Sequence, residues 1–323
     1  MTKGSLRACA VQAAPAFLDR EATLSIVLDR LQGGKEGGAD LCVFPETFWS
    51  GYPFWVDITD ASRFDEARQK EAYAQYLDAA VEVDGPQFRE VVAACRDLDL
   101  FAYLGVAERS ESGGSVYCTL VAIDPERGVV GVHRKLRPTY GERLVWAPGD
   151  GNGLRVHDFR GARLGGLNCW ENWMPLARAS LYAQGEQIHA ATWPGAPHLT
   201  RDISRFVALE GRVFVISAGA VLRAEHLPHD FALRDEVLAV RDRFTSGGSI
   251  IVAPDGEVLA EAEKHAETLL FADLDLARAR EERQNFDPAG HYGRPDVLGL
   301  RLDRRRLAPL ESPASESDVV DSK

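Results

Sequence analysis

The sequence predicts an α/β layered sandwich. In the first half of the chain, short apolar segments typical of strands alternate with segments of helical periodicity, and apolar pairs joined by turns follow later. The 323 residues contain neither an internal repeat nor a Gly/Ser-rich linker, so one large core is expected. We therefore expect a single domain over residues 1–306. Where Ser, Pro, Glu and Asp dominate, residues 307–323 are expected to form a disordered tail.

The chain opens with the pattern of a β-α-β unit. Residues 6–13 alternate and are rich in small apolar side chains, which predicts a strand. Helical spacing follows over residues 20–31, and the glycine pair 33–34 is expected to end that helix. A short buried strand over residues 41–44 then delivers Glu46 into a loop.

The loop over residues 48–55 is unusually aromatic. Its rings either complete the core or form the wall of an apolar substrate pocket, because aromatic side chains commonly line small-molecule sites. Both interpretations stay open at this point.

The alternation continues along the chain. Residues 62–80 and 88–98 predict helices, and residues 100–107 predict a strand. Residues 116–123 and 129–133 predict paired strands joined by a turn. The later elements are, in order, a strand over 187–193, a helix over 201–212, a strand over 213–220 and a hairpin-like pair over 249–252 and 257–260.

One stretch, residues 163–175, combines a strand that stops abruptly with a helix that restarts. The apolar run 164–167 predicts a buried strand ending near Cys169, and helical spacing resumes at Trp173, where Pro175 suits a first turn. A cysteine at such an elbow is a candidate nucleophile, and we expect helix amides to favour its thiolate. Free cysteines are also common as small core residues. Whether Cys169 is a nucleophile therefore depends on which polar residues lie beside it.

Three polar residues of complementary chemistry each follow an apolar strand: Glu46, Lys135 and Cys169. Because the ends of adjacent strands converge in α/β sheets, these side chains can meet in one pocket. A carboxylate can accept the thiol proton and later activate water, an ammonium can stabilise developing charge, and a thiolate can attack. Taken singly, Glu46 could cap a loop and Lys135 could belong to a solvated basic run.

Composition argues against several classes of function. A formal net charge of −12 with interspersed basic residues excludes a typical nucleic-acid partner, and the basic run over residues 301–306 is interpreted as a solvated face. No GxxxxGK[ST] phosphate loop is present, so nucleotide dependence is not expected. Five cysteines without a CxxC pair indicate neither a disulfide framework nor a zinc cluster, and they fit a reducing compartment. With neither a signal-peptide pattern nor an apolar run of membrane-span length, a soluble cytoplasmic protein without membrane contact is expected.

The sequence resembles the nitrilase branch of the carbon-nitrogen hydrolase superfamily. The residues that carry the resemblance occur in the family's order over nearly the whole chain. They are Phe44-Pro45-Glu46 with Gly51-Tyr52-Pro53, His133-Arg134-Lys135-Leu136-Arg137-Pro138-Thr139 with Glu142-Arg143 and Trp146, Cys169-Trp170-Glu171 with Met174-Pro175-Leu176, Trp193-Pro194-Gly195, and His291-Tyr292-Gly293-Arg294-Pro295-Asp296-Val297-Leu298.

The resemblance implies a four-layer αββα sandwich with a catalytic triad of Glu46, Lys135 and Cys169. It also implies that the carboxylate of Glu142 lies beside the triad and helps to orient it. The implied reaction converts an organic nitrile to the carboxylic acid and ammonia through a thioimidate and a thioester, with some amide by-product. Neither a metal nor an organic cofactor is implied. Asn172 stands where many bacterial nitrilases carry His, which bears on the substrate subclass.

Several alternatives remain open. An amidase or N-carbamoyl amidohydrolase would use the same triad, although the Cys-Trp-Glu motif favours the nitrilase. A Cys-His peptidase with a base such as His133, or a non-enzymatic scaffold, is less consistent with the full triad. The partner is then a small nitrile, and Tyr52, Trp170 and Trp193 are candidate substrate-binding residues.

The resemblance also implies a homodimer formed across the helix over about residues 173–184. In bacterial nitrilases such dimers often extend into spirals. Arylaliphatic or aliphatic nitriles are placed slightly ahead of benzonitriles, cyanoalanine and cyanide as substrates.

Overall fold

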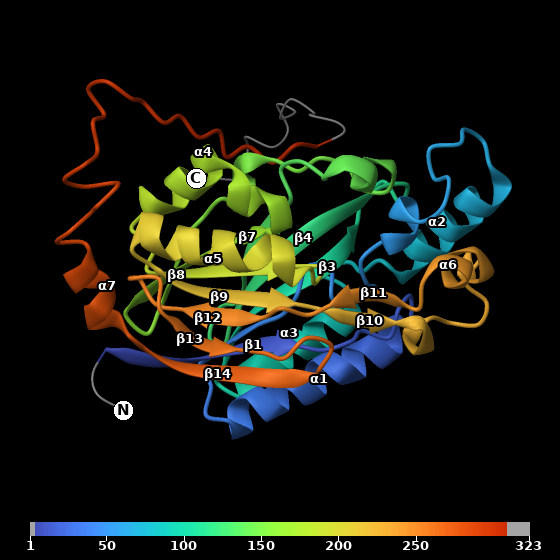
Figure 1. Ribbon diagram of the computed structural model, residues 1–323, viewed down its shortest axis with the longest axis horizontal. Helices are drawn as coiled ribbons and strands as arrows, with labels where there is room; N and C mark the ends of the chain where they lie inside the picture. Colours follow the sequence, from blue (N-terminus) through green and yellow to red (C-terminus); the bar gives the residue numbers. More distant parts are fainter. Residues whose placement is uncertain (1–3, 309–323) are drawn as a thin grey trace, which may run out of the picture.

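The computed structural model describes residues 4–308, which form two six-stranded β-sheets packed face to face with helices on both outer faces (Figure 1). Helices α1 (Arg20–Glu36) and α3 (Pro86–Asp97) cover one sheet, and α4 (Pro175–Tyr182) and α5 (Pro197–Gly211) cover the other. The expected four-layer αββα sandwich is thereby confirmed.

The first sheet has the strand order β14-β1-β2-β3-β4-β5. Its central strands β1, β2 and β3 are parallel, and β14, β4 and β5 run antiparallel to their neighbours. The bounds are β1 Ser5–Gln12, β2 Leu41–Val43, β3 Phe101–Arg109, β4 Val116–Asp124, β5 Gly128–Arg134 and β14 Thr268–Asp275.

The second sheet has the order β13-β12-β9-β8-β7-β6, and its strands β7, β8 and β9 are parallel. The bounds are β6 His157–Phe159, β7 Ala162–Asn168, β8 Ile188–Trp193, β9 Phe214–Gly219, β12 Ile250–Val252 and β13 Val258–Glu261. The remaining elements are η1 Phe54–Asp57, α2 Ala67–Ala79, η2 Tyr140–Leu144, η3 Gly151–Gly153, η4 Cys169–Trp173, β10 Val221–Arg223, η5 Ala224–His226, α6 Arg234–Val240, β11 Arg243–Ser246 and α7 Leu276–Glu282.

Strand alternation explains why β1 can lie between two cores. Ala8 and Ala10 face the second sheet, whereas Cys9 and Val11 face the helices α1 and α3. Because successive side chains of a strand point to opposite faces, a strand buried on both sides must be apolar throughout. The small apolar run seen in the sequence reflects this double burial.

The glycine pair 33–34 does not end the first helix, contrary to expectation, and α1 continues to Glu36 with Gly37 as its C-cap. A Cβ at Gly33 would lie 2.8 Å from Leu269, and one at Gly34 would lie 2.5 Å from the sulfur of Cys42. These glycines allow the helix to approach the sheet closely, so their role is packing rather than termination.

The end of the chain differs from expectation in a second way, because β14 was not anticipated. It pairs with β1 over the full length of that strand, from Ser5 opposite Asp275 to Gln12 opposite Thr268. Of the predicted tail, residues 307 and 308 have no regular secondary structure, and the remainder of 307–323 lies outside the described residues. None of the helices within residues 4–308 is long and apolar enough to cross a membrane.

Candidate active site

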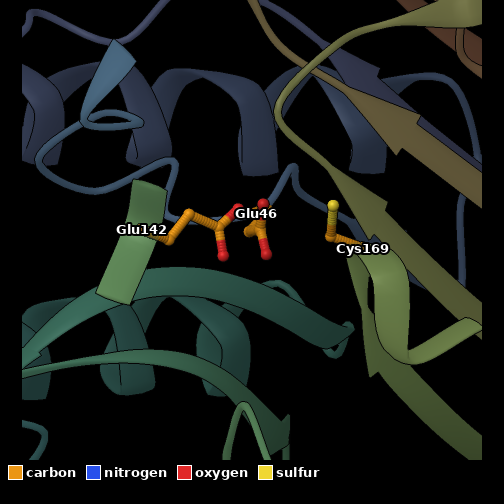
Figure 2. A group of neighbouring side chains, drawn as sticks. All are labelled: Glu46, Glu142 and Cys169. Atoms are coloured by element: carbon orange, nitrogen blue, oxygen red, sulfur yellow. The ribbon is translucent and has the colours of Figure 1, made fainter. Parts of the chain in front are cut away.

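The ends of three strands bring Glu46, Lys135 and Cys169 together between the sheets. Glu46 follows β2, Lys135 directly follows β5, and Cys169 directly follows β7. All three are buried, with exposed fractions of 4% or less. Figure 2 shows the carboxylates of Glu46 and Glu142 turned toward each other, with Cys169 at the end of its strand opposite. One oxygen of each carboxylate and the sulfur of Cys169 all lie within 4.8 Å of one another.

The ammonium of Lys135 lies between the two carboxylates. Its Nζ donates to Glu46 Oε1 at 2.8 Å and to Glu142 Oε2 at 2.7 Å. Burial disfavours the charge, but Glu46, Cys169 and Glu142 together hold the pKa of Lys135 well above its usual value. Lys135 is therefore a permanent cation.

Glu142 is fixed from three directions. Its Oε2 accepts the main-chain N–H of Thr139 at 2.6 Å, which closes a capping box at the start of η2. Its Oε1 accepts the hydroxyl of Tyr52 at 3.1 Å. With the bond from Lys135, the orientation of this carboxylate is set before any substrate binds.

Glu46 has one occupied oxygen and one free oxygen. Its Oε1 accepts from Lys135 and from the thiol of Cys118 at 3.3 Å, whereas Oε2 is buried without a partner among the described residues. Burial, together with the charge of Glu142, raises the pKa of Glu46 to about 7 against the opposing effect of Lys135. A carboxylate with a free oxygen and a pKa near neutrality is suited to accept a proton.

Cys169 rests as a thiol, contrary to the expectation that helix amides would favour the thiolate. Burial and the neighbouring carboxylates raise the pKa of Cys169 well above its usual value, although Lys135 and the Trp170 N–H act in the opposite direction. The helix amides of α4 do not stabilise the thiolate enough, because Cys169 begins a five-residue 3₁₀ turn and α4 starts only at Pro175. The nucleophile therefore needs a base to remove its proton.

The main chain at Cys169 has a φ of 46°, which lies in the left-handed region that residues other than glycine rarely adopt. A buried chain of polar groups holds this conformation. Asn172 Nδ2 donates to the carbonyl oxygens of Cys169 at 2.9 Å and Leu167 at 3.3 Å, and its Oδ1 lies 2.7 Å from Nε2 of His189. His189 in turn contacts Glu186 through Nδ1 at 2.8 Å.

A cavity of about 310 Å³ opens beside Cys169, and all three predicted substrate-binding residues line it. Tyr52 also donates to Glu142, Trp193 is buried, and Trp170 is 42% exposed and stacks on Trp173. Of the aromatic loop 48–55, Tyr52 and Phe54 reach the cavity. Other loop rings, such as Trp49, complete the core, so both interpretations of the loop hold in part.

The profile of the carbon-nitrogen hydrolase family matches residues 7–284. A bifunctional nitrilase/nitrile hydratase from Nicotiana tabacum is 35% identical over 98% of this chain and 92% of its own. An aliphatic nitrilase from Sinorhizobium fredii is 39% identical over 94% of this chain and 96% of its own. Among solved structures, the C. elegans NitFhit protein superposes with a TM-score of 0.70 at 18% identity, covering 96% of this chain and 70% of its own. A carbon-nitrogen hydrolase from Helicobacter pylori gives 0.65 at 20% identity, covering 90% and 96%.

Proposed function

Because this chain belongs to the carbon-nitrogen hydrolase family, we propose that it is a nitrilase, which hydrolyses an organic nitrile to the carboxylic acid and ammonia. The observation that carries the proposal is the buried cluster in which Lys135 joins Glu46 to Glu142 beside the thiol of Cys169. We assign Cys169 as nucleophile, Glu46 as base, Lys135 as the stabilising cation and Glu142 as the group that orients Lys135.

The first step forms a covalent bond between enzyme and substrate. Oε2 of Glu46 takes the proton from Cys169 while the sulfur attacks the nitrile carbon, and that proton then passes to the nitrile nitrogen. We assign the stabilisation of the negative charge that develops on this nitrogen to Lys135 and the Trp170 N–H, which both act on the thiol of Cys169. The product of the step is a thioimidate.

Two water molecules complete the reaction. Glu46 removes a proton from the first as it adds to the thioimidate, giving a tetrahedral intermediate that bears a hydroxyl and an amino group. Protonation of the amino group releases ammonia and leaves a thioester, which the second water hydrolyses to the acid and free thiol. If the tetrahedral intermediate expels the thiolate instead, the corresponding amide is released.

The cavity supports arylaliphatic or aliphatic nitriles as the substrate class. Its walls include Phe54, Trp173, Leu199 and Phe244 in addition to the three predicted residues, so most of the lining is apolar. An aromatic ring on a short linker can reach Cys169 while its faces contact these side chains.

The test is a panel of nitriles with their matching amides, in which ammonia, acid and amide are quantified for the natural protein and for Cys169→Ala. Acid from nitriles that is absent in Cys169→Ala is the expected result. Turnover of the amides alone would move the chain to the amidase alternative, and activity that survives in Cys169→Ala would overturn the mechanism.

We further propose that the protein forms a homodimer through α4 and α5, where Leu176, Phe206 and Leu209 are exposed. Sedimentation of the natural protein and of Leu176→Asp tests this, and a dimer that dissociates in the variant is expected. A spiral assembly would appear as larger species in the same experiment. A cytoplasmic location is proposed from the five free cysteines.

A further inference from the structure

The carboxylate of Glu171 is buried two residues after Cys169 and does not line the cavity. Its Oε1 accepts the main-chain N–H of Leu136 at 2.7 Å, and its Oε2 accepts that of Asn168 at 2.9 Å. Nε2 of His133 lies 2.9 and 3.1 Å from the two oxygens. Despite burial, His133 and the two N–H groups hold the pKa of Glu171 below its usual value, so the group is ionised.

One main-chain donor lies just after a strand of the first sheet, and the other is the last residue of a strand of the second sheet. Leu136 directly follows Lys135 at the end of β5 in the first sheet, and Asn168 directly precedes Cys169 at the end of β7 in the second sheet. One carboxylate therefore joins the residue next to the cation to the residue next to the nucleophile. We propose that Glu171 is a positioning residue that sets the distance between Lys135 and Cys169 across the interface of the two sheets.

Packing alone does not fix that distance. The face between the sheets is mainly apolar, with small residues such as Ala8, Ala10 and Ala190, and apolar contact is non-directional. Hydrogen bonds are directional, and those at a charged acceptor are the strongest kind. On the Glu46 side the Glu46 N–H donates across the interface to the carbonyl oxygen of Trp193 at 3.3 Å, and Gln12 at the end of β1 accepts the N–H groups of Gly248 and Ser249. Glu171 supplies the corresponding connection on the Lys135 side.

Counting donors and acceptors identifies the informative variant. Both oxygens of Glu171 must accept, whereas a glutamine offers one oxygen and one NH₂ group. In Glu171→Gln either Leu136 or Asn168 therefore faces a donor, and its N–H loses its partner while remaining buried. Glu171→Asp keeps two accepting oxygens on a side chain one methylene shorter.

The first experiment measures kcat and KM for the best nitrile together with the melting temperature. A misplacement of about 1 Å costs on the order of 100-fold in rate, so Glu171→Gln is expected to lose about that factor in kcat with KM changed less than about threefold. Glu171→Asp should recover at least about a tenth of the natural kcat.

Asp40→Asn is the matched control. Asp40 is also buried, accepts a main-chain N–H from Arg7 and pairs with Arg160 between β6 and β7, so it too connects the two sheets. It precedes β2, however, and therefore lies at the opposite end of that strand from Glu46.

The second experiment does not need a nitrile substrate, and this matters because the inference rests on the proposed function. The rate of Cys169 alkylation by iodoacetamide is followed against pH, with the modified peptide identified by mass spectrometry. Glu46, Lys135, Glu142 and Tyr52 are the titratable groups that face the thiol. Moving Lys135 away removes the group that favours the thiolate, so the alkylation midpoint in Glu171→Gln should rise by about half to one pH unit.

The outcomes separate the two proposals. If the natural protein does not hydrolyse nitriles, the proposed function is overturned. The difference in alkylation midpoint between the natural protein and Glu171→Gln then still tests the role of Glu171. Unchanged kcat and midpoint in a folded Glu171→Gln overturn the positioning role. The same holds if losses in the Glu171 and Asp40 variants simply follow their melting temperatures. If Glu171→Gln does not fold, Glu171→Asp decides. A kcat that falls by up to about tenfold while the melting temperature stays within a few degrees supports the positioning role, and an unchanged kcat overturns it.

Discussion

The two sheets contribute different chemistry to the site that they share. The segments that follow first-sheet strands carry the charged groups next to the thiol, because Lys135 is bonded to Glu46 and Glu142 and the Glu142 carboxylate also accepts the Thr139 N–H. The second sheet contributes Cys169 as a neutral thiol and the apolar ring of Trp193. The first-sheet side is therefore a preorganised charged cluster. The second-sheet side provides the nucleophilic sulfur and much of the lining of the substrate cavity. Changes on the first side should therefore alter the chemistry, and changes at the wall of the second side should alter substrate preference.

The largest loss is expected from removing the cation. In Lys135→Met two buried carboxylates face each other without a counter-charge, and only the Trp170 N–H is left to stabilise the developing charge on the substrate nitrogen. We expect kcat to fall by about 10³-fold or more. The free energy of unfolding should also fall, by ~3–5 kcal/mol. Steady-state kinetics and denaturant titration measure both.

The control for Lys135→Met is Lys70→Met, because Lys70 is exposed and forms only a surface pair with Asp65. It should change neither quantity measurably. If Lys135→Met retained a tenth or more of the natural kcat, the charged side would not be the source of rate acceleration.

A smaller loss is expected from Glu142→Gln. The amide oxygen can still accept from Lys135 and Thr139, but it carries no charge, and the NH₂ group replaces the oxygen that accepts from Tyr52, so the ammonium is held less firmly. We expect kcat to fall by about 10- to 100-fold with little change in KM. Tyr52→Phe removes only one donor to Glu142 and should cost less, about 3- to 10-fold. A larger effect of Tyr52→Phe than of Glu142→Gln would contradict this order.

The pH dependence tests the base on the charged side. Because the pKa of Glu46 is raised to about 7, the group is ionised and able to accept a proton above that pH, and kcat/KM should decline as the pH falls through it. Cys118 donates to Glu46 and stabilises its ionised form. Cys118→Ala should therefore raise the pKa of Glu46 and move the acid limb upward by about half a pH unit.

The matched control for Cys118→Ala is Cys95→Ala, which removes an equally buried thiol from α3. Its acid limb should stay in place. A shift of equal size in both variants would assign the effect to general loosening of the core instead of to the bond at Glu46.

Glu46, Lys135 and Cys169 could be predicted to meet because each follows an apolar segment, and the ends of neighbouring strands converge whatever lies between them. Glu142 could be placed only through the resemblance, since no strand precedes it closely. Its position depends on the capping box of η2, which closes only when the loop folds.

The remaining parts of the site depend on contacts that spacing does not encode. Cys118 lies 72 positions from Glu46, and Glu171 lies 35 positions from Leu136, so neither pairing has a local signal. The prediction of a thiolate at Cys169 was wrong. Burial, which cannot be deduced from a motif, raises the pKa of Cys169 more than the N–H groups of the short turn that follows lower it. Local patterns identify which residues can react, whereas the packing of the two sheets sets their ionisation.

The smallest effect is expected at the outer rim of the wall. Trp170 is half exposed and contacts Trp173, so removing its ring in Trp170→Ala leaves the charged cluster intact and reduces the apolar area available to a substrate. KM for an arylaliphatic nitrile should rise about 3- to 10-fold, while KM for a short aliphatic nitrile should change less than about twofold. The kcat values should stay within about threefold because no reacting group moves. An equal fall of kcat for both substrates would instead mean that the Trp170 ring fixes the main-chain conformation at Cys169. The wall of the second sheet would then affect the chemical step as well as substrate preference.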